Sequence, residues 1–148
     1  MGFSTSSTFG GLAETPAFDK LARNGLKYTN FHTTAICAPS RAALLTGRNH
    51  HSVHMGHFTE TAFDAPGYDG YMPFEKATMA EVLRENGYNT FAVGKWHLTP
   101  VNERSDAGTS NRWPTGRGFD YSYGFHESCT CLLYTSEAAD ELPGVRLR

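Results

Sequence analysis

Two short segments of the sequence combine reactive residue types at close spacing. The first, C-A-P-S-R at residues 37–41, places a cysteine two residues before a proline and four before an arginine. The second, G-K-W-H at residues 94–97, places a lysine two residues before a histidine. A thiol is a nucleophile, a guanidinium binds tetrahedral oxyanions, and histidine moves protons near neutral pH. Together the two segments predict a site that binds an anionic substrate and reacts with it.

The first segment is expected at the start of a helix that begins at Pro39 or Ser40 and ends at Gly47. Pro39 favours an extended residue before it, so Cys37 is predicted just outside the helix. The free N–H groups of the first turn attract an anion, and Arg41 adds a permanent positive charge there. A buried structural cysteine is the alternative reading, and it is the more common one for this residue type alone.

The second segment follows a short apolar run at residues 88–93, which is typical of a buried parallel strand. Ligands of open α/β sheets bind beyond the carboxyl ends of strands. Lys95 and His97 are two residues apart, so in an extended chain their side chains project to one side. A solvated lysine and an ordinary loop histidine remain the alternative for the pair taken by itself.

Two helix–strand pairs are predicted along the chain, which indicates an α/β fold. In the first, Thr15 caps a helix that opens at Pro16, Gly25 ends it in a left-handed conformation, and residues 26–31 form a strand.

In the second pair, Thr78 and Glu81 form a capping box at the start of a helix over residues 79–86. Gly87 ends this helix, and the apolar run described above follows it. The segments around these elements, residues 1–13, 48–76 and 99–118, are predicted to be loops.

The composition narrows the class of protein without naming a function. The chain has 148 residues, of which 39% are hydrophobic, and a net charge of −2, so no basic surface for nucleic acid is indicated. No apolar run is long enough to span a membrane, and no signal peptide is visible. Three cysteines are too few for a disulfide framework. The compartment stays open between cytoplasmic and periplasmic or secreted.

The two reactive segments together resemble the signatures of the sulfatase family. C-A-P-S-R-A-A-L-L-T-G-R at residues 37–48 resembles the first signature, and G-Y-N-T-F-A-V-G-K-W-H at residues 87–97 resembles the second. Neighbouring segments, such as T-P-A-F-D-K-L-A-R-N-G-L and P-G-Y-D-G-Y, are similar to sequences of bacterial arylsulfatases. The resemblance covers about residues 2–125.

The resemblance implies a partial alkaline-phosphatase/sulfatase-like domain, a three-layer αβα fold truncated at both ends. On this interpretation residues 1–126 are part of the N-terminal catalytic domain. Residues 127–148, which include C-L-L-Y-T-S-E-A-A-D-E, resemble translated adapter sequence and form an unrelated tail.

The resemblance also implies roles for four residues. Cys37 would be oxidised to formylglycine by a formylglycine-generating enzyme that reads the C-A-P-S-R core. The hydrated aldehyde carries two hydroxyls: one attacks the sulfur of a sulfate ester, and the other expels the sulfate. Arg41 would neutralise and orient this diol, Lys95 would bridge it to the sulfate, and His97 would act as the base. Lys95, His97 and Arg41 would therefore also bind the substrate, an aryl or small organic sulfate.

Members of the family hold one Ca²⁺ ion between carboxylates and an amide. Apart from the modified Cys37, the resemblance places no metal ligand in this chain, because the paired aspartates and the later Asp and Asn ligands have no counterpart here. A metal contributes several kcal/mol of charge stabilisation in such sites. The chain alone is therefore predicted to be inactive and, with sheet edges exposed, poorly soluble.

Two other functions fit parts of the sequence. Phosphonate and phosphodiester hydrolases related to sulfatases share the Cys-x-Pro-x-Arg core, and both substrates are tetrahedral anions. A separate possibility is a zinc-binding module that uses the histidine-rich stretch from residue 50 to residue 57, with His50, His54 and His57 as ligands.

Overall fold

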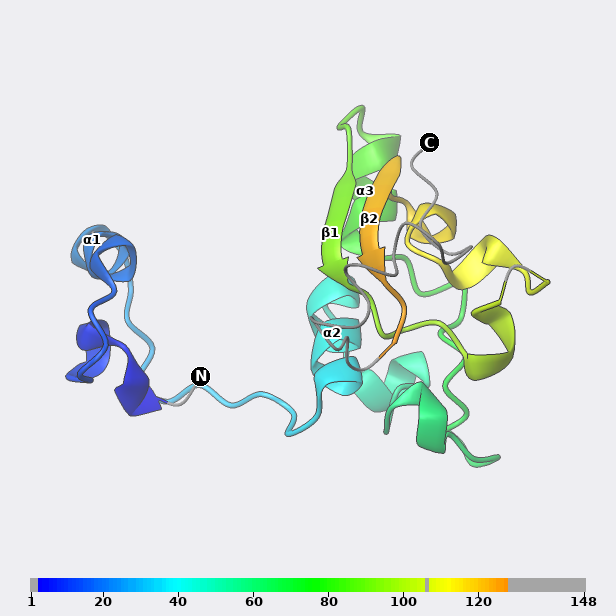
Figure 1. The fold of residues 1–148 in the computed structure, drawn as a ribbon, viewed down its shortest axis with the longest axis horizontal. Helices are drawn as coiled ribbons and strands as arrows, with labels where there is room; N and C mark the ends of the chain where they lie inside the picture. Colours follow the sequence, from blue (N-terminus) through cyan, green and yellow to red (C-terminus); the bar gives the residue numbers. More distant parts are fainter. Residues whose placement is uncertain (1–2, 106, 128–148) are drawn as a thin grey trace, which may run out of the picture. The chain divides into compact units, whose positions relative to one another are not determined.

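The computed structural model describes residues 3–105 and 107–127, which belong to two compact units. The first unit ends at Thr33 and the second begins at Thr34. Among the described residues, one α-helix lies in the first unit, and two α-helices and two strands lie in the second (Figure 1). None of the helices in this described part has the length and apolar character that crossing a bilayer requires.

The first unit is built on helix α1, Pro16–Asn24, preceded by two short 3-10 turns. Pro16 occupies the start of the helix as predicted, where its missing N–H costs nothing. The predicted cap from the Thr15 side chain is wrong. Its hydroxyl instead bonds the hydroxyls of Ser6 at 2.5 Å and Ser7 at 3.0 Å, which ties the preceding turns to the helix.

Two further predictions for the first unit are wrong. Gly25 is extended (φ −142°) rather than left-handed, so the chain leaves α1 without a glycine turn. Residues 26–31 form no strand, because a strand requires a hydrogen-bonded partner and the described part of this unit offers them none. Leu26 and Phe31 are accordingly exposed.

Helix α2, Cys37–Thr46, opens the second unit and carries the first reactive segment. The helix starts two or three residues earlier than the predicted Pro39 or Ser40, with Ile36 as its N-cap, so Cys37 lies inside the first turn and not outside it. Pro39 is tolerated there because N–H groups of a first turn have no intrahelical acceptor. The end is confirmed: Gly47 is left-handed (φ 65°), and its N–H bonds the Ala43 carbonyl at 2.9 Å.

Helix α3, Met79–Glu85, has the predicted capping box. The Glu81 N–H donates to the Thr78 hydroxyl at 3.2 Å, and the Thr78 N–H donates to the Glu81 carboxylate at 2.6 Å. The helix ends at Glu85, one residue earlier than predicted, with Asn86 as its C-cap, and the left-handed Gly87 (φ 84°) follows.

Strands β1, Phe91–Lys95, and β2, Tyr121–Phe125, pair in parallel in register from Phe91 with Tyr121 to Lys95 with Phe125. The α/β class is therefore confirmed as a mixed helical and parallel-sheet structure. The predicted strand is displaced towards Lys95, and its predicted burial is wrong. Phe91 is 64% exposed and Val93 is 79% exposed, because no described element covers them.

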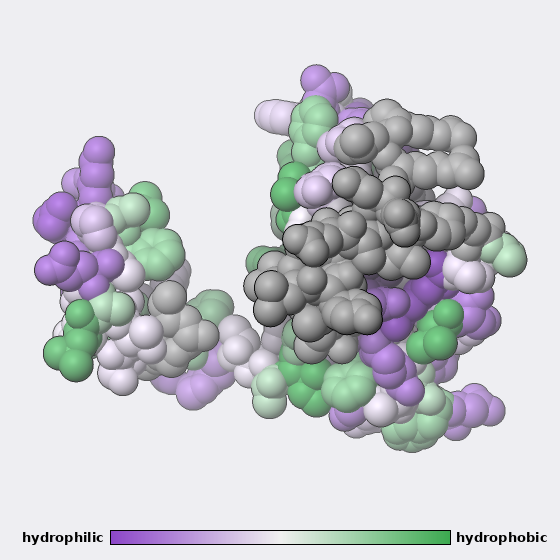
Figure 2. Space-filling view, in the orientation of Figure 1, coloured by the Kyte–Doolittle hydropathy of each residue, from purple (hydrophilic) through white to green (hydrophobic). Residues whose placement is uncertain are grey.

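The core of the second unit lies between α2 and the chain that follows β1. Figure 1 shows α2 next to the arrowheads of β1 and β2, where the carboxyl ends of both strands lie. Apolar side chains are also visible on the surface in Figure 2. The buried apolar residues that pack together are Ala38, Ala42, Val53, Met55, Met72, Trp96 and Leu98.

Candidate active site at the carboxyl end of strand β1

The chain turns into the core directly after β1. The Trp96 N–H bonds the Phe125 carbonyl at 2.8 Å, so the sheet ladder continues one residue beyond the strand. His97 then has a positive φ of 58° and a completely buried side chain. The predicted extended conformation is therefore wrong at His97, and the projection of Lys95 and His97 to one side stays a prediction. A non-glycine residue held at positive φ is uncommon and requires strong packing around it.

The two reactive segments meet at Cys37 and His97. The Cys37 Sγ lies 3.2 Å from the His97 Nδ1, although 60 positions separate the two residues in the sequence. Cys37 is exposed, whereas the His97 ring is buried. This places a thiol at the surface with an imidazole directly behind it, an arrangement in which the imidazole could take a proton from residue 37.

Arg41 joins helix α2 to the end of β1. Its Nε donates to the Trp96 carbonyl at 2.8 Å, and its terminal NH2 group donates to the Lys95 carbonyl. Burial lowers the pKa of Arg41, while the charge of a Cys37 thiolate acts on it in the opposite direction. The guanidinium therefore fixes the main chain beside the thiol as well as supplying a positive charge there.

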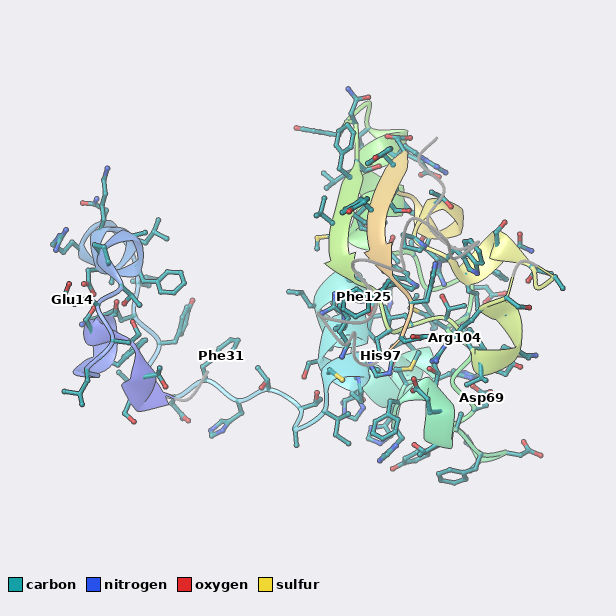
Figure 3. All side chains as sticks on the ribbon, in the orientation of Figure 1. Glu14, Phe31, Asp69, His97, Arg104 and Phe125 are labelled. Atoms are coloured by element: carbon teal, nitrogen blue, oxygen red, sulfur yellow. The ribbon has the colours of Figure 1, made fainter. Side chains whose placement is uncertain are left out.

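Behind His97 lies a carboxylate that the sequence reasoning missed. The His97 Nε2 is 2.9 Å from the Glu60 Oε2, and the second oxygen of Glu60 accepts a hydrogen bond from Arg104 NH1 at 2.9 Å. Arg104 in turn donates from Nε to the Thr99 carbonyl at 3.0 Å and also bonds the Thr59 hydroxyl. Figure 3 shows His97 and Arg104 in the same part of the second unit.

The charges around His97 shift two pKa values. Burial raises the pKa of Glu60, but hydrogen bonds from Arg104 and His97 outweigh burial and lower this pKa to about 2. Burial lowers the pKa of His97; Glu60 opposes the shift, and the positive charges of Lys95 and Arg104 add to it. Glu60 is therefore ionised at neutral pH, and the His97 ring favours its neutral form, which can accept a proton.

All four predicted site residues lie near one point, with different contacts. Cys37 and His97 touch, and Arg41 bonds the backbone of β1. Lys95, half-buried at the end of β1, is close enough for its charge to act on His97. The roles that the resemblance assigns to them stay predictions.

Sequence spacing carried no signal for Glu60 or Arg104. Both residues come from segments predicted as loops, residues 48–76 and 99–118, and each is 40 or so positions from the other. Only the fold brings Glu60 to His97. An acidic residue within a long ordered loop was the one available hint, since such loops often carry function.

The described residues do not fit a calcium centre. Residues 3–105 and 107–127 contain no group of three or more histidine, cysteine or acidic side chains that could hold a metal ion. Ca²⁺ takes six to eight oxygen ligands, and both carboxylate oxygens of Glu60 are already paired, one with His97 and the other with Arg104.

The histidine-rich stretch does not form a zinc site either. His50 Nδ1 is 3.2 Å from the Met55 carbonyl, His54 Nδ1 is 2.8 Å from Asp69, and His57 Nδ1 contacts the Thr61 hydroxyl. Each ring has its own partner, and within the described part of the chain they do not converge.

A cavity of about 750 Å³ lies beside the two strands. Arg41 and Lys95 contribute to its lining, but Cys37 and His97 do not. The cavity follows β1 and β2 and does not include the contact between Cys37 and His97.

Comparisons with known proteins agree on one family. A family model described as Sulfatase matches residues 1–135. Over 130 residues the chain is 38% identical to an uncharacterized sulfatase of Schizosaccharomyces pombe, covering 83% of the chain and 22% of that protein. Over 127 residues it is 33% identical to an arylsulfatase of Klebsiella aerogenes, covering 84% of the chain and 26% of that protein.

Solved structures give a similar result. The structure titled Ps i-CgsB matches with a TM-score of 0.66 and 28% identity, covering 98% of this chain and 32% of that one. A structure from work on glycosaminoglycan metabolism by Bacteroides thetaiotaomicron matches with a TM-score of 0.56 and 30% identity, covering 84% of this chain and 26% of that one. The chain thus spans about a fifth to a third of the length of these relatives.

Proposed function

Because this chain belongs to the sulfatase family, we propose that the complete protein carrying it hydrolyses sulfate esters through residue 37. The family match extends over most of the chain, and relatives from a yeast and a bacterium bear sulfatase names. The observation that carries the proposal is the 3.2 Å contact between Cys37 and His97, which joins the two reactive segments.

The proposed nucleophile is a formylglycine made from Cys37 by a formylglycine-generating enzyme. When hydrated, it supplies one hydroxyl that attacks sulfur and displaces the alcohol of the ester, which leaves the sulfate bound to residue 37. Deprotonation of the second hydroxyl then re-forms the aldehyde and breaks the bond to the sulfate, which is released. Cys37 is exposed at the start of α2, so its side chain is accessible to a substrate. The C-A-P-S-R core that such an enzyme would read is intact.

His97 is the proposed base. Its Nδ1 faces the side chain of residue 37, and its ring is buried against Phe58, with ring centroids 6.1 Å apart. A base held in this position takes a proton from residue 37 without reorientation, which is worth on the order of 10²- to 10⁴-fold in rate.

Arg41 and Lys95 are proposed to bind the sulfate. Both lie at the carboxyl end of β1, where ligands of α/β sheets bind. The Arg41 guanidinium is partly committed to carbonyls of the main chain, so its contribution is mainly a fixed positive field at residue 37.

The 148-residue chain alone is proposed to be inactive. The resemblance to the family implies a Ca²⁺ ion, and the described residues do not provide a cluster of ligands that fits this ion. A measurable, steady release of sulfate by the isolated chain supplied with Ca²⁺ would contradict this part of the proposal.

The proposed substrate is an aryl or small organic sulfate, which agrees with the arylsulfatase name of the Klebsiella aerogenes relative. A phosphonate or phosphodiester substrate is the alternative, because Cys37 and its neighbours recognise a tetrahedral anion of either kind. Side-by-side kinetics of the complete protein on nitrophenyl sulfate and nitrophenyl phosphonate would separate them. Faster turnover of the phosphonate would overturn the sulfatase assignment.

The site itself is tested by a pair of histidine substitutions in the complete protein. His97→Ala is expected to lower sulfatase kcat by about 100-fold or more, since it removes a positioned base. His54→Ala serves as the matched control, because His54 pairs with Asp69 outside the site. Equal rates for the two variants would refute the role of His97.

A further inference from the structure

We propose that Glu60 is a positioning residue: it fixes His97 in the tautomer that carries its proton on Nε2, so that the Nδ1 lone pair faces residue 37. The proposal rests on the proposed function, in which His97 is the base. It adds a residue from the loop segment 48–76, and it explains how a fully buried ring keeps one orientation.

The ring of His97 has a different partner at each nitrogen. The Nδ1 lies 3.2 Å from the Cys37 Sγ, and the Nε2 lies 2.9 Å from the Glu60 Oε2. A neutral imidazole carries one N–H, and an ionised carboxylate can only accept a hydrogen bond. The proton therefore belongs on Nε2, and Nδ1 is left with the lone pair that a base requires.

Burial makes this choice of tautomer depend on Glu60. The His97 side chain is 0% exposed, so in the folded chain its Nε2 is screened from bulk water and Glu60 is the acceptor it faces. Without Glu60, the N–H at Nε2 would lose this charged acceptor, and the preference for a proton on Nε2 over one on Nδ1 would weaken. A proton on Nδ1 would face residue 37 and block proton transfer from it.

Arg104 holds Glu60 in place from the other side. Its NH1 is 2.9 Å from the Glu60 Oε1, while its Nε is anchored on the Thr99 carbonyl at 3.0 Å. Thr99 lies two residues after His97, so Arg104 is bonded to the same short segment of backbone that carries the His97 ring. The strong lowering of the Glu60 pKa by this arrangement is consistent with an acceptor that stays ionised.

An exclusively structural role for Glu60 is the competing explanation, since an ion pair with Arg104 would also tie two loops together. The tautomer distinguishes the two roles. A second histidine–carboxylate pair, His54 with Asp69 at 2.8 Å, provides an internal control. It is more than a third exposed on both side chains and makes no contact with Cys37 that the structure shows among the described residues.

The test is long-range ¹H–¹⁵N correlation NMR on the full 148-residue chain labelled with ¹⁵N-histidine, recorded at pH 8. We expect wild-type His97 to show a protonated Nε2 and an unprotonated Nδ1. Glu60→Ala should mix the tautomers or reverse them, Glu60→Gln should keep the Nε2–H form through its amide oxygen, and Asp69→Asn should leave His97 unchanged. Circular dichroism would verify that each variant is folded.

A wild-type spectrum with the proton on Nδ1, or an unchanged tautomer in folded Glu60→Ala, would overturn the proposal. The wild-type spectrum decides even if Glu60→Ala does not fold. In the complete protein, Glu60→Ala should lower kcat by about 10- to 1,000-fold with little change in KM. If the wild-type protein has no sulfatase activity while the tautomer is as expected, the proposed function fails and the positioning role of Glu60 stands.

Discussion

Strand β1 and the four residues that follow it differ sharply in how the protein surrounds them. Within the strand, Phe91 is 64% exposed and Val93 is 79% exposed. Directly after it, Trp96 is 4% exposed, and His97 and Leu98 are fully buried. The same stretch of chain thus passes from an uncovered sheet into a packed core within a few residues.

The contrast shows that the end of β1 is packed by other residues of the second unit, whereas the middle of the strand is not. The end of β1 is covered by α2, by Glu60 and Arg104, and by the 3-10 turns around them. The exposed residues of β1 have no such cover among the described residues. The geometry around Cys37 and His97 is therefore set by residues inside the second unit and not by the sheet face.

The largest expected effect is on stability at the buried end of β1. Trp96→Ala should lower the free energy of unfolding by about 3–5 kcal/mol, because it empties a core position. The indole also donates to the Arg112 carbonyl at 3.0 Å and packs edge-on against Phe119. Urea denaturation followed by circular dichroism measures the change.

Val93→Ala, three residues earlier in the same strand and exposed, is the matched control. Its expected effect is within about 0.5 kcal/mol. Similar losses of unfolding free energy in the two variants would mean that Val93 is covered in solution, and would contradict the difference between the strand and the residues that follow it.

The next effect concerns the link between α2 and β1. Arg41→Ala should lower the free energy of unfolding by about 1–3 kcal/mol, because two carbonyls at the end of β1 lose their donor. Arg84→Ala, on the exposed side of α3, is the control and should change stability by less than about 0.5 kcal/mol. Equal stability of Arg41→Ala and wild type in urea would show that this link contributes nothing.

A third effect depends on pH. The pKa of Glu60 lies at about 2 in the folded chain against 4.5 for an ordinary glutamate. Its stabilisation is therefore complete above about pH 4.5 and is lost as the pH falls through 2. Allowing for the partial exposure of Glu60, this loss should amount to about 1–2 kcal/mol.

Burial lowers the pKa of His97 and adds acid sensitivity in the same direction, beginning below about pH 6.5. Unfolding free energies between pH 7 and pH 2 should thus decline less steeply below pH 4.5 in Glu60→Gln than in wild type. Glu75→Gln, at an exposed position, should follow the wild-type curve. Parallel curves for Glu60→Gln and wild type would contradict the ionised state of Glu60.

The smallest effect on stability is expected on the open face of the sheet, where solubility changes instead. Val93→Lys places a charge on an exposed apolar strand and should reduce aggregation of the isolated chain. The free energy of unfolding should move by less than about 0.5 kcal/mol. Light scattering over time measures the aggregation, and unchanged scattering would argue against an uncovered face.

Local signals in the sequence predicted helix ends of the second unit but not those of α1, where the Thr15 cap and the left-handed Gly25 were wrong. The capping box of Thr78 and Glu81 and the left-handed Gly47 are confirmed, because each depends on residues within one turn of a helix. The strand at residues 26–31 and the burial of β1 were wrong, because both depend on what packs alongside.

The same distinction applies to the site. The motifs indicated Cys37, Arg41, Lys95 and His97, since each pair lies within one short segment of sequence. Glu60 reaches His97 only through the fold, from 37 positions away, so no spacing rule could predict it. Of the predicted tail, residues 127–148, all but the first residue lie outside the described residues, and its assignment as an unrelated segment stays a prediction.

The central claim, that residue 37 becomes the reactive group, is tested most directly by peptide mass spectrometry of the chain after coexpression with a formylglycine-generating enzyme. We predict that the peptide containing residue 37 has the mass of the aldehyde in place of the thiol, and that Arg41→Ala, which breaks the recognition core, prevents the conversion. A peptide that retains an unmodified Cys37 under conditions that convert a known sulfatase would contradict the account.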